Sequence, residues 1–261
     1  MTGHIEIKNV RKEFENTDPS RPNVLVLQNF TLDVQPGSFV SLIGPSGCGK
    51  STLLRLIGGL DQPDEGEILL DDARITGPGK DRGFAFQGSD LFPWLTVERN
   101  IAFGLKARHE YKTKKADVQE YIDLVGLTGF EKSYPHQLSG GMNQRAALAR
   151  SLVGHPSVLL LDEPLGALDA FTRMNLQDEI LSIREQHNMT MIMVTHDVDE
   201  AIYMSDQVVV MRESPSRVEA VIDIELSRPR ARAQDSFAVY RTQILNILHL
   251  GGNIPRVEYN I

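Results

Sequence analysis

The sequence has almost no cysteine and no long apolar run, and each absence restricts what the chain can be. Of its 261 residues only Cys48 is a cysteine, so no internal disulfide can form and a reducing compartment is expected. No apolar stretch approaches the roughly 20 residues of a membrane-spanning helix, and residues 1–10 lack the basic-then-apolar layout of a signal peptide. We therefore expect a cytoplasmic chain that does not cross a bilayer by itself.

The chain also lacks the excess of positive charge that nucleic-acid binding requires. Its net charge is −8, and the short basic cluster of Arg228, Arg230 and Arg232 is expected to be a solvated loop. The sequence thus excludes a general nucleic-acid binder. Its hydrophobic content of 41% is sufficient for one large domain with a buried core.

Apolar periodicity predicts an α/β fold that opens with antiparallel strands. The alternation at Ile5, Ile7 and Val10, followed by residues 24–34, is typical of a half-exposed sheet. Five later apolar runs alternate with helical stretches, which predicts a largely parallel sheet. These runs are residues 39–43, 83–86, 158–161, 189–195 and 207–211.

The strand pattern stops after Gln87, and a helical pattern continues to about residue 156. We expect residues 1–261 to form one domain with a helical subdomain inserted in it. The expected parts are a sheet core with an antiparallel β subdomain over 1–86 and 157–230, the helical subdomain over 87–156, and a C-terminal helix and tail over 231–261.

Residues 44–51, Gly-Pro-Ser-Gly-Cys-Gly-Lys-Ser, match the phosphate-loop pattern at every fixed place, between a predicted strand and a predicted helix. Glycines let backbone N–H groups surround the phosphates of ATP, Lys50 adds a positive charge, and the Ser51 hydroxyl suits Mg²⁺. We therefore favour an ATP site over a Gly-rich turn with a surface lysine. Its expected residues are Gly44, Pro45, Ser46, Gly47, Cys48, Gly49, Lys50, Ser51 and Thr52. Cys48 is also predicted to carry a reactive thiol.

A second motif is the apolar run of residues 158–161 followed by Asp162, Glu163 and Pro164. A parallel sheet presents residues at its C-terminal edge, beside the phosphate loop. Asp162 is predicted to hold Mg²⁺ and Glu163 to act as general base towards the attacking water. Without the phosphate loop, two exposed acids at a strand end would be an equally good interpretation.

Residues 138–141, Leu-Ser-Gly-Gly, precede a helical stretch and alone would indicate only a good helix N-cap. With the other motifs they resemble the signature of the ATP-binding subunits of ABC transporters, in which Gln usually follows and Met142 stands here. The resemblance covers nearly the whole chain and implies a P-loop NTPase fold with a mixed sheet and an inserted helical subdomain. It implies that Ser139, Gly140 and Gly141 contact ATP, and it leaves the effect of Met142 open.

The same resemblance implies four more site residues. Phe14 matches the aromatic that stacks on adenine, Gln87 the glutamine that senses Mg²⁺, and His196 the switch histidine that contacts the γ-phosphate. Residues 166–169, Gly-Ala-Leu-Asp, resemble the D-loop and add Asp169 to the ATP site. Taken singly, Phe14 would be a core or surface aromatic and His196 a structural histidine. The implied catalytic residues are Glu163, His196 and Gln87, and the implied Mg²⁺ ligands are Ser51, Gln87 and Asp162.

Residues 91–101, the Gly-Gly-Met signature and residues 169–173 are similar to importers of nitrate, sulfonates, taurine and bicarbonate. This likeness implies a peripheral ATPase on the cytoplasmic face of the inner membrane, coupled to solute transport. Its implied partners are permease subunits, a second ATP-binding subunit that is identical or a paralogue, and, indirectly, a solute-binding protein. The apolar residues 92–95 are expected to contact the permease, with a core anchor at Trp94 as the alternative. The solute is not determined, because it contacts other subunits.

Other ABC ATPases fit the sequence less well. A DNA-repair or chromosome-organising ATPase needs a long coiled coil, and residues 50–138 hold no heptads and have room only for a small insert. A translation factor would carry two cassettes, and this chain has one. An exporter would be distinguished by a fused membrane domain.

Overall fold

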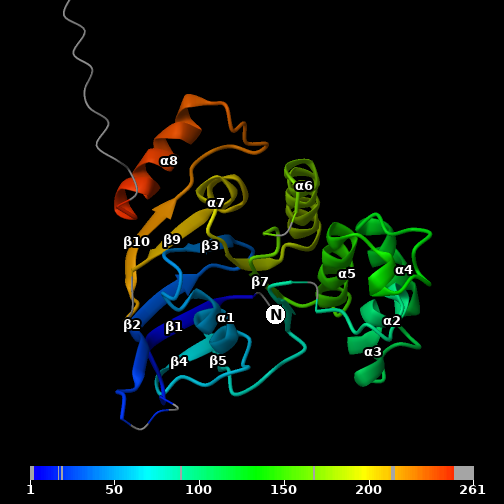
Figure 1. Ribbon diagram of the computed structural model, residues 1–261, viewed down its shortest axis with the longest axis horizontal. Coiled ribbons are helices and arrows are strands. Elements are labelled where there is room, and N and C mark those ends of the chain that lie inside the picture. The colour runs from blue at the N-terminus through cyan, green and yellow to red at the C-terminus, as the bar shows by residue number, and fades with distance from the viewer. Residues whose placement is uncertain are drawn as a thin grey trace, which may run out of the picture.

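The computed structural model describes residues 3–16, 18, 20–88, 90–166, 168–212 and 215–249, and their strands form two sheets (Figure 1). The first sheet is antiparallel and has the order β2-β1-β4-β5. Its strands are β1 (Ile5–Phe14), β2 (Val24–Val34), β4 (Glu65–Leu70) and β5 (Ala73–Arg74). The predicted antiparallel opening is confirmed. Sequence reasoning missed β4, whose first three residues are Glu, Gly and Glu and give little apolar signal.

The second sheet is mixed and has the order β10-β9-β3-β8-β7-β6. Its strands are β3 (Phe39–Ile43), β6 (Arg82–Ala85), β7 (Val158–Asp162), β8 (Thr190–Val194), β9 (Gln207–Met211) and β10 (Val218–Asp223). All pairs are parallel except β10 with β9. Every residue of β3, β7 and β8 is buried, as expected for parallel strands covered on both faces. The five predicted runs all form strands, whereas the edge strand β10 was not predicted.

The helices are α1 (Lys50–Ile57), α2 (Val97–Ile101), α3 (Phe103–Ala107), α4 (Lys115–Leu124), α5 (Gly140–Leu152), α6 (Ala170–His187), α7 (Val198–Met204) and α8 (Asp235–Ile247), with a 3₁₀ turn at Pro135–Gln137. α1 lies between the two sheets, and its Leu53 shares an apolar cluster with Ile7 of β1 and Val40 of β3 (Figure 1). This packing fixes the start of α1 against the ends of the parallel strands.

α2 to α5, drawn in green in Figure 1, lie to one side of the sheets. Val97 of α2 and Tyr121 of α4 belong to the same buried cluster as Leu161 of β7, so the apolar core continues from the sheet into these helices. Within the part of the chain that the structure describes, no helix is long and apolar enough to cross a membrane. The predicted C-terminal helix is α8, and residues 250–261 of the expected tail lie outside the described residues.

The basic cluster near the C-terminus is not a solvated loop, so that prediction is wrong. Arg230 is only 8% exposed. Its guanidinium donates to the carbonyls of Ile202 at 2.6 Å, Ile224 at 3.1 Å and Leu226 at 3.1 Å. Burial lowers the pKa of Arg230 to about 10. One guanidinium has five N–H donors and can bind several backbone carbonyls at once. Arg230 therefore attaches the segment around residue 230 to α7 by hydrogen bonds.

Replacing Arg230 by methionine should destabilise the fold, because buried carbonyls lose their donor. We expect the free energy of unfolding to fall by about 2–4 kcal/mol, measured by urea denaturation followed by circular dichroism. Arg21→Met is the control, since the side chain of Arg21 is 74% exposed, and it should change the value by less than about 0.5 kcal/mol. Equal stability of the two variants would contradict a structural role for Arg230.

Candidate functional site

The loop between β3 and α1 is shaped by glycine and held by a lysine. Gly49, which caps α1, has a φ of 93°, and a Cβ built on it would lie 2.7 Å from Val26 Cγ1. A larger residue would therefore be both strained and in collision there. Lys50 Nζ donates to the carbonyls of Gly44 and Pro45, each at 2.8 Å. The loop thus surrounds one buried ammonium group at the start of a helix, an arrangement suited to phosphate groups.

Ser51 and Asp162 bring two oxygen ligands together beside this loop. Ser51 Oγ donates to Asp162 Oδ1 at 3.0 Å, although the two residues belong to α1 and β7. Burial raises the pKa of Asp162, which the Ser51 hydrogen bond opposes and the charge of Glu163 reinforces. A hydroxyl and a carboxylate are hard oxygen donors of the kind that Mg²⁺ takes beside phosphate groups, so this pair fits the ion.

Glu163 lies between two side chains that follow neighbouring strands. Gln87 Nε2 donates to Glu163 Oε2 at 3.0 Å, and His196 Nδ1 lies 3.6 Å from Glu163 Oε1. The backbone of Glu163 has a φ of 46°, a left-handed conformation that is costly for a non-glycine residue and is often found at functional sites. These three side chains follow β6, β7 and β8.

The convergent residues line one cavity of about 490 Å³. Its lining consists of Ser46, Gly47, Lys50, Ser51, Gln87, Glu163 and His196. The structure therefore brings together the phosphate loop and all three residues predicted to be catalytic. A general base candidate, a cation and hydroxyl donors in one cavity are the components of a phosphoryl-transfer site.

The structure places the signature residues elsewhere. Ser139 is the N-cap of α5 and accepts from the Met142 N–H at 3.2 Å. Neither Gly140 nor Gly141 lines the cavity, and a Cβ on Gly140 would meet no atom of the described residues within 4 Å. The Met142 side chain packs, partly buried, against the main apolar core. Met142 is thus a packing residue. Gly141 lies beside the side chains of Thr172 and Leu168, and both glycines lie outside the cavity of their own chain.

Phe14, Thr52 and Asp169 are among the other predicted residues that do not line this cavity. Phe14 ends β1 opposite Val24 and is 39% exposed, with Lys12 Nζ 5.3 Å from its ring centre. Asp169 caps α6 by accepting from the Phe171 and Thr172 N–H groups, both at 3.1 Å. Thr52 is half-buried in the first turn of α1. Residue 167 of the expected D-loop lies outside the described residues.

The prediction of a reactive thiol at Cys48 is not supported by its surroundings. Cys48 is only 1% exposed and belongs to the apolar cluster between the sheets. Within the loop its sulfur accepts from Lys50 Nζ at 3.6 Å, in a contact that is itself buried. Sequence position near a helix start suggested reactivity, but packing of the side chain inward removes the access that reactivity requires.

Sequence reasoning missed a polar network behind His196. Thr195 Oγ1 donates to buried Glu200 and accepts from the Asp197 N–H at 3.1 Å, so the backbone on both sides of His196 is held. Arg173 donates to the Leu168 carbonyl at 3.1 Å and lies 3.5 Å from Asp197. This arginine therefore joins the loop before α6 to the loop that carries His196. Helix capping at Asp197 was the available signal in the sequence.

Residues that follow Gln87 in the chain form an apolar surface. Trp94 is 69% exposed and Phe103 44% exposed, and Phe92 packs between them with ring centres 5.5 Å and 4.5 Å away. Buried Asn100 fixes this loop, since its side chain exchanges hydrogen bonds with both the N–H and the carbonyl of Phe92. Trp94 is not a core anchor, so that alternative is wrong.

Comparisons with known proteins agree with this geometry. The family model described as ABC transporter matches residues 27–166. The chain is 51% identical to the aliphatic sulfonates import ATP-binding protein SsuB of Bacillus thuringiensis subsp. konkukian over 96% of this chain and 98% of that protein. It is 48% identical to SsuB of Bacillus subtilis over 85% and 86% of the two chains.

A solved structure also resembles the fold. It is the dimeric, post-hydrolysis ATP-binding cassette MJ0796 bound to ADP and Pi, with a TM-score of 0.76 and 30% identity over 85% of this chain and all of that one. The phosphate loop, the carboxylates after β7, the matching family model and these extensive identities lead to one conclusion. The chain belongs to the ABC transporter family as an ATP-binding subunit, an ATPase that acts on ATP with Mg²⁺.

Proposed function

We propose that this chain powers the import of aliphatic sulfonates through a partner permease, as a peripheral subunit on the cytoplasmic face of the cell membrane. The observation that carries the solute class is the 51% identity, over nearly the full length of both chains, to a protein named for aliphatic sulfonate import. Nitrate, taurine and bicarbonate are the alternatives from the same group of importers.

In the proposed reaction, Lys50 and the backbone of residues 44–49 bind the β- and γ-phosphates of ATP. Ser51 and Asp162, which lie 3.0 Å apart at their oxygens, would hold Mg²⁺ with Gln87 nearby. When bound there, the ion supplies charge compensation for the phosphates. Phe14 would stack on the adenine, at the end of the strand pair whose Val26 touches the phosphate loop.

Glu163 is the proposed general base for the attacking water. Gln87 and His196 flank its two carboxylate oxygens at 3.0 Å and 3.6 Å, so they orient the carboxylate towards the cavity. His196 would then contact the γ-phosphate. Base, orienting groups and the cationic loop face one cavity, which supports the proposed role of Glu163 as general base.

The cavity of one chain is incomplete for this reaction without a second cassette. Ser139, Gly140 and Gly141 start α5 outside the cavity, and a helix N-terminus with free N–H groups suits a phosphate. We propose that a second subunit, identical or a paralogue, docks head to tail so that its signature and its Asp169 close each ATP site. The solved structure of the similar cassette MJ0796 is dimeric, which supports a pair of ATP-binding subunits.

The permease is proposed to dock on the surface of Phe92, Trp94 and Phe103. This surface is exposed and apolar, and it follows directly on Gln87, so docking and hydrolysis would be connected through one loop. Residues 87–156 would act as the helical subdomain that carries it. Residue 89, between Gln87 and this surface in the chain, lies outside the described residues. A soluble ABC ATPase of the DNA-repair type is less well supported, since the longest helix described between residues 50 and 138 has 10 residues.

Glu163→Gln should retain ATP binding and lose turnover, because the amide keeps the shape and hydrogen bonding but cannot take a proton. We expect kcat to fall by about 10²–10⁴-fold, measured by phosphate release under saturating ATP. Lys50→Ala is the contrasting variant, and it should weaken ATP binding about ten-fold or more by removing a charged contact. Near-normal hydrolysis by the Glu163 variant would show that another group is the base.

Trp94→Ala should reduce co-purification of the permease several-fold while leaving the ATPase activity of the isolated subunit unchanged, because the side chain is exposed and outside the cavity. Pull-down, ATPase rate and thermal stability are compared in the same preparations. Val239→Ala on α8, which removes a 64% exposed apolar side chain elsewhere, is the control. Full permease binding by the Trp94 variant would place the docking surface elsewhere.

The solute class is tested with the transporter reconstituted in vesicles together with its permease and solute-binding protein. Aliphatic sulfonates should stimulate ATP hydrolysis, whereas nitrate and bicarbonate at equal concentration should leave the basal rate unchanged. Stimulation by nitrate or bicarbonate alone would assign another solute while preserving the ATPase role.

A further inference from the structure

A second, smaller cavity with a strongly basic lining lies where β6, α3 and the end of α5 meet. Its volume is about 170 Å³. Four of its lining residues are cationic, and no carboxylate residue is among them. The lining consists of Lys80, Arg82, Gly83, Phe84, Gly104, Arg108, Arg150, Ser151, Val153, Gly154 and Pro156. None of these residues lines the cavity of the phosphate loop, so the two cavities are separate.

The positive charge of this lining is only partly compensated. Arg82 pairs with Asp81 at 3.3 Å, and Arg108 lies 3.5 Å from Glu110. Among the described residues, Lys80 and Arg150 form no ion pair with a carboxylate within 4 Å. Arg150 donates to the Asp90 carbonyl at 2.8 Å and lies over the Phe92 ring instead, and burial lowers its pKa. The charges of Glu110 and Asp90 act on Lys80 and Arg150 at longer range, but neither cation has an ion pair among the described residues, so the cavity attracts anions.

Arg82 adds a donor that the described part of the protein leaves unsatisfied. Its side chain is 7% exposed, and Nη2 donates to the Gly77 carbonyl at 2.7 Å. Arg82 Nε is buried and has no hydrogen-bond partner among the described residues. Arg82 therefore lines the cavity as a buried cation whose donors the described residues satisfy only in part.

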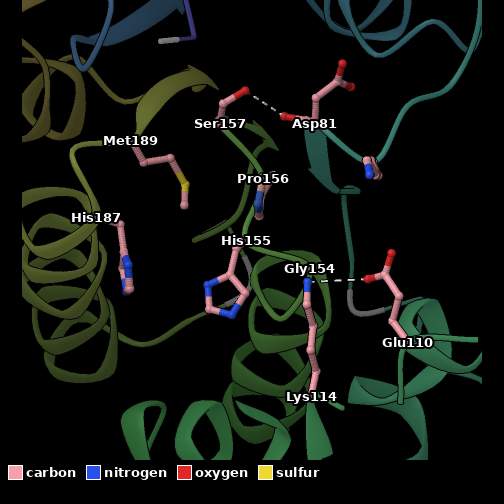
Figure 2. Close-up of a pocket in the computed structure, with 10 residues that line it drawn as sticks. Asp81, Glu110, Lys114, Gly154, His155, Pro156, Ser157, His187 and Met189 are labelled. Atoms are coloured by element: carbon pink, nitrogen blue, oxygen red, sulfur yellow. Dashed lines mark hydrogen bonds and ion pairs between the residues drawn. The ribbon is translucent and has the colours of Figure 1, made fainter. Parts of the chain in front are cut away.

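A larger cavity of about 450 Å³ adjoins this one and shares Lys80, Gly154 and Pro156 with it (Figure 2). Figure 2 shows Lys114 reaching the carboxylate of Glu110, at 3.4 Å, on one side of it. His155 and His187 lie on the other side, with ring centres 6.2 Å apart. The adjoining cavity offers space for an organic substituent carried by an anion.

We propose that the basic cavity binds a tetrahedral oxyanion group, as free sulfate or phosphate or as the head group of a small organic sulfonate or phosphate ester. Lys80, Arg82, Arg108 and Arg150 supply the positive charge. The volume of about 170 Å³ accommodates an ion of five heavy atoms. Several N–H donors converging on one anion give charge-assisted hydrogen bonds.

Such a ligand would connect three elements that lead to the hydrolysis site. β6 ends just before Gln87, and α5 begins at the signature residues. Arg150 at the end of α5 already holds the loop of Asp90 and Phe92. An anion bound here would therefore stabilise the relative position of the sheet and the helices α3 and α5, independently of which solute the transporter carries.

The test measures anion binding by isothermal titration calorimetry, with a saturating non-hydrolysable Mg-ATP analogue present, because the phosphate loop itself attracts oxyanions and ADP would leave the γ-phosphate position open to them. Sulfate, phosphate and methanesulfonate are titrated separately at constant ionic strength, with chloride as the non-tetrahedral control. The wild-type chain should bind at least one oxyanion saturably, and chloride should not compete at equal concentration. Tighter binding of methanesulfonate would identify an organic sulfonate as the ligand, and tighter binding of sulfate or phosphate would identify the free ion.

The double variant Lys80→Gln with Arg108→Gln should bind the preferred anion about ten-fold or more weakly, since two charged contacts are lost. The control is Lys112→Gln with Lys132→Gln, which makes the same charge change at two exposed positions outside the cavity and should bind within about two-fold of wild type. If the double variant does not fold, Lys80→Gln alone, at an exposed position, should still weaken binding several-fold. The proposal is overturned if the wild type shows no saturable binding, or if the cavity and control variants behave alike.

Discussion

The site depends on one structural constraint, the parallel arrangement that brings the ends of β3, β6, β7 and β8 to one edge of a sheet. The hydrogen bond from Ser51 to Asp162 is a direct result of this arrangement, because it joins the helix after β3 to the end of β7, although β8 lies between these two strands. Packing of α1 between the two sheets holds this contact in place. Residues separated by more than 100 positions thereby become neighbours.

Around that edge, the backbone does much of the positioning. Gly49 turns the phosphate loop in a conformation only glycine adopts easily, and Glu163 is held in a left-handed conformation while its N–H donates to the Val194 carbonyl at 3.0 Å. Thr195, Glu200 and Arg173 then fix the loop of His196 from behind. The network offers a physical route by which the loop before α6 and the loop of His196 would move together.

The helices α2 to α5 have two distinct relations to the rest of the molecule. Their inner faces continue the core of the sheet, while the loop pinned by Asn100 presents Phe92 and Trp94 outward. Buried polar residues such as Asn100 make this possible, because a fully satisfied side-chain amide can hold a loop without placing its apolar residues in the core. The same principle applies at Arg230, where one guanidinium binds several carbonyls of another segment.

The sequence by itself determined the parts of the protein whose geometry is local. The phosphate loop, the apolar run before Asp162 and Glu163, and the N-cap at Ser139 are contiguous motifs in which nearby backbone and residue type decide the shape, and continuous apolar runs predicted the buried parallel strands. Only the tertiary structure decided that Gln87, Glu163 and His196 meet in one cavity while Ser139 to Gly141 lie outside it. It also decided that Trp94 is exposed, that Cys48 and Arg230 are buried, and that polar-starting β4 and edge strand β10 join their sheets. These outcomes depend on packing between segments that are distant in the chain. A local residue pattern cannot indicate which distant segment covers a side chain.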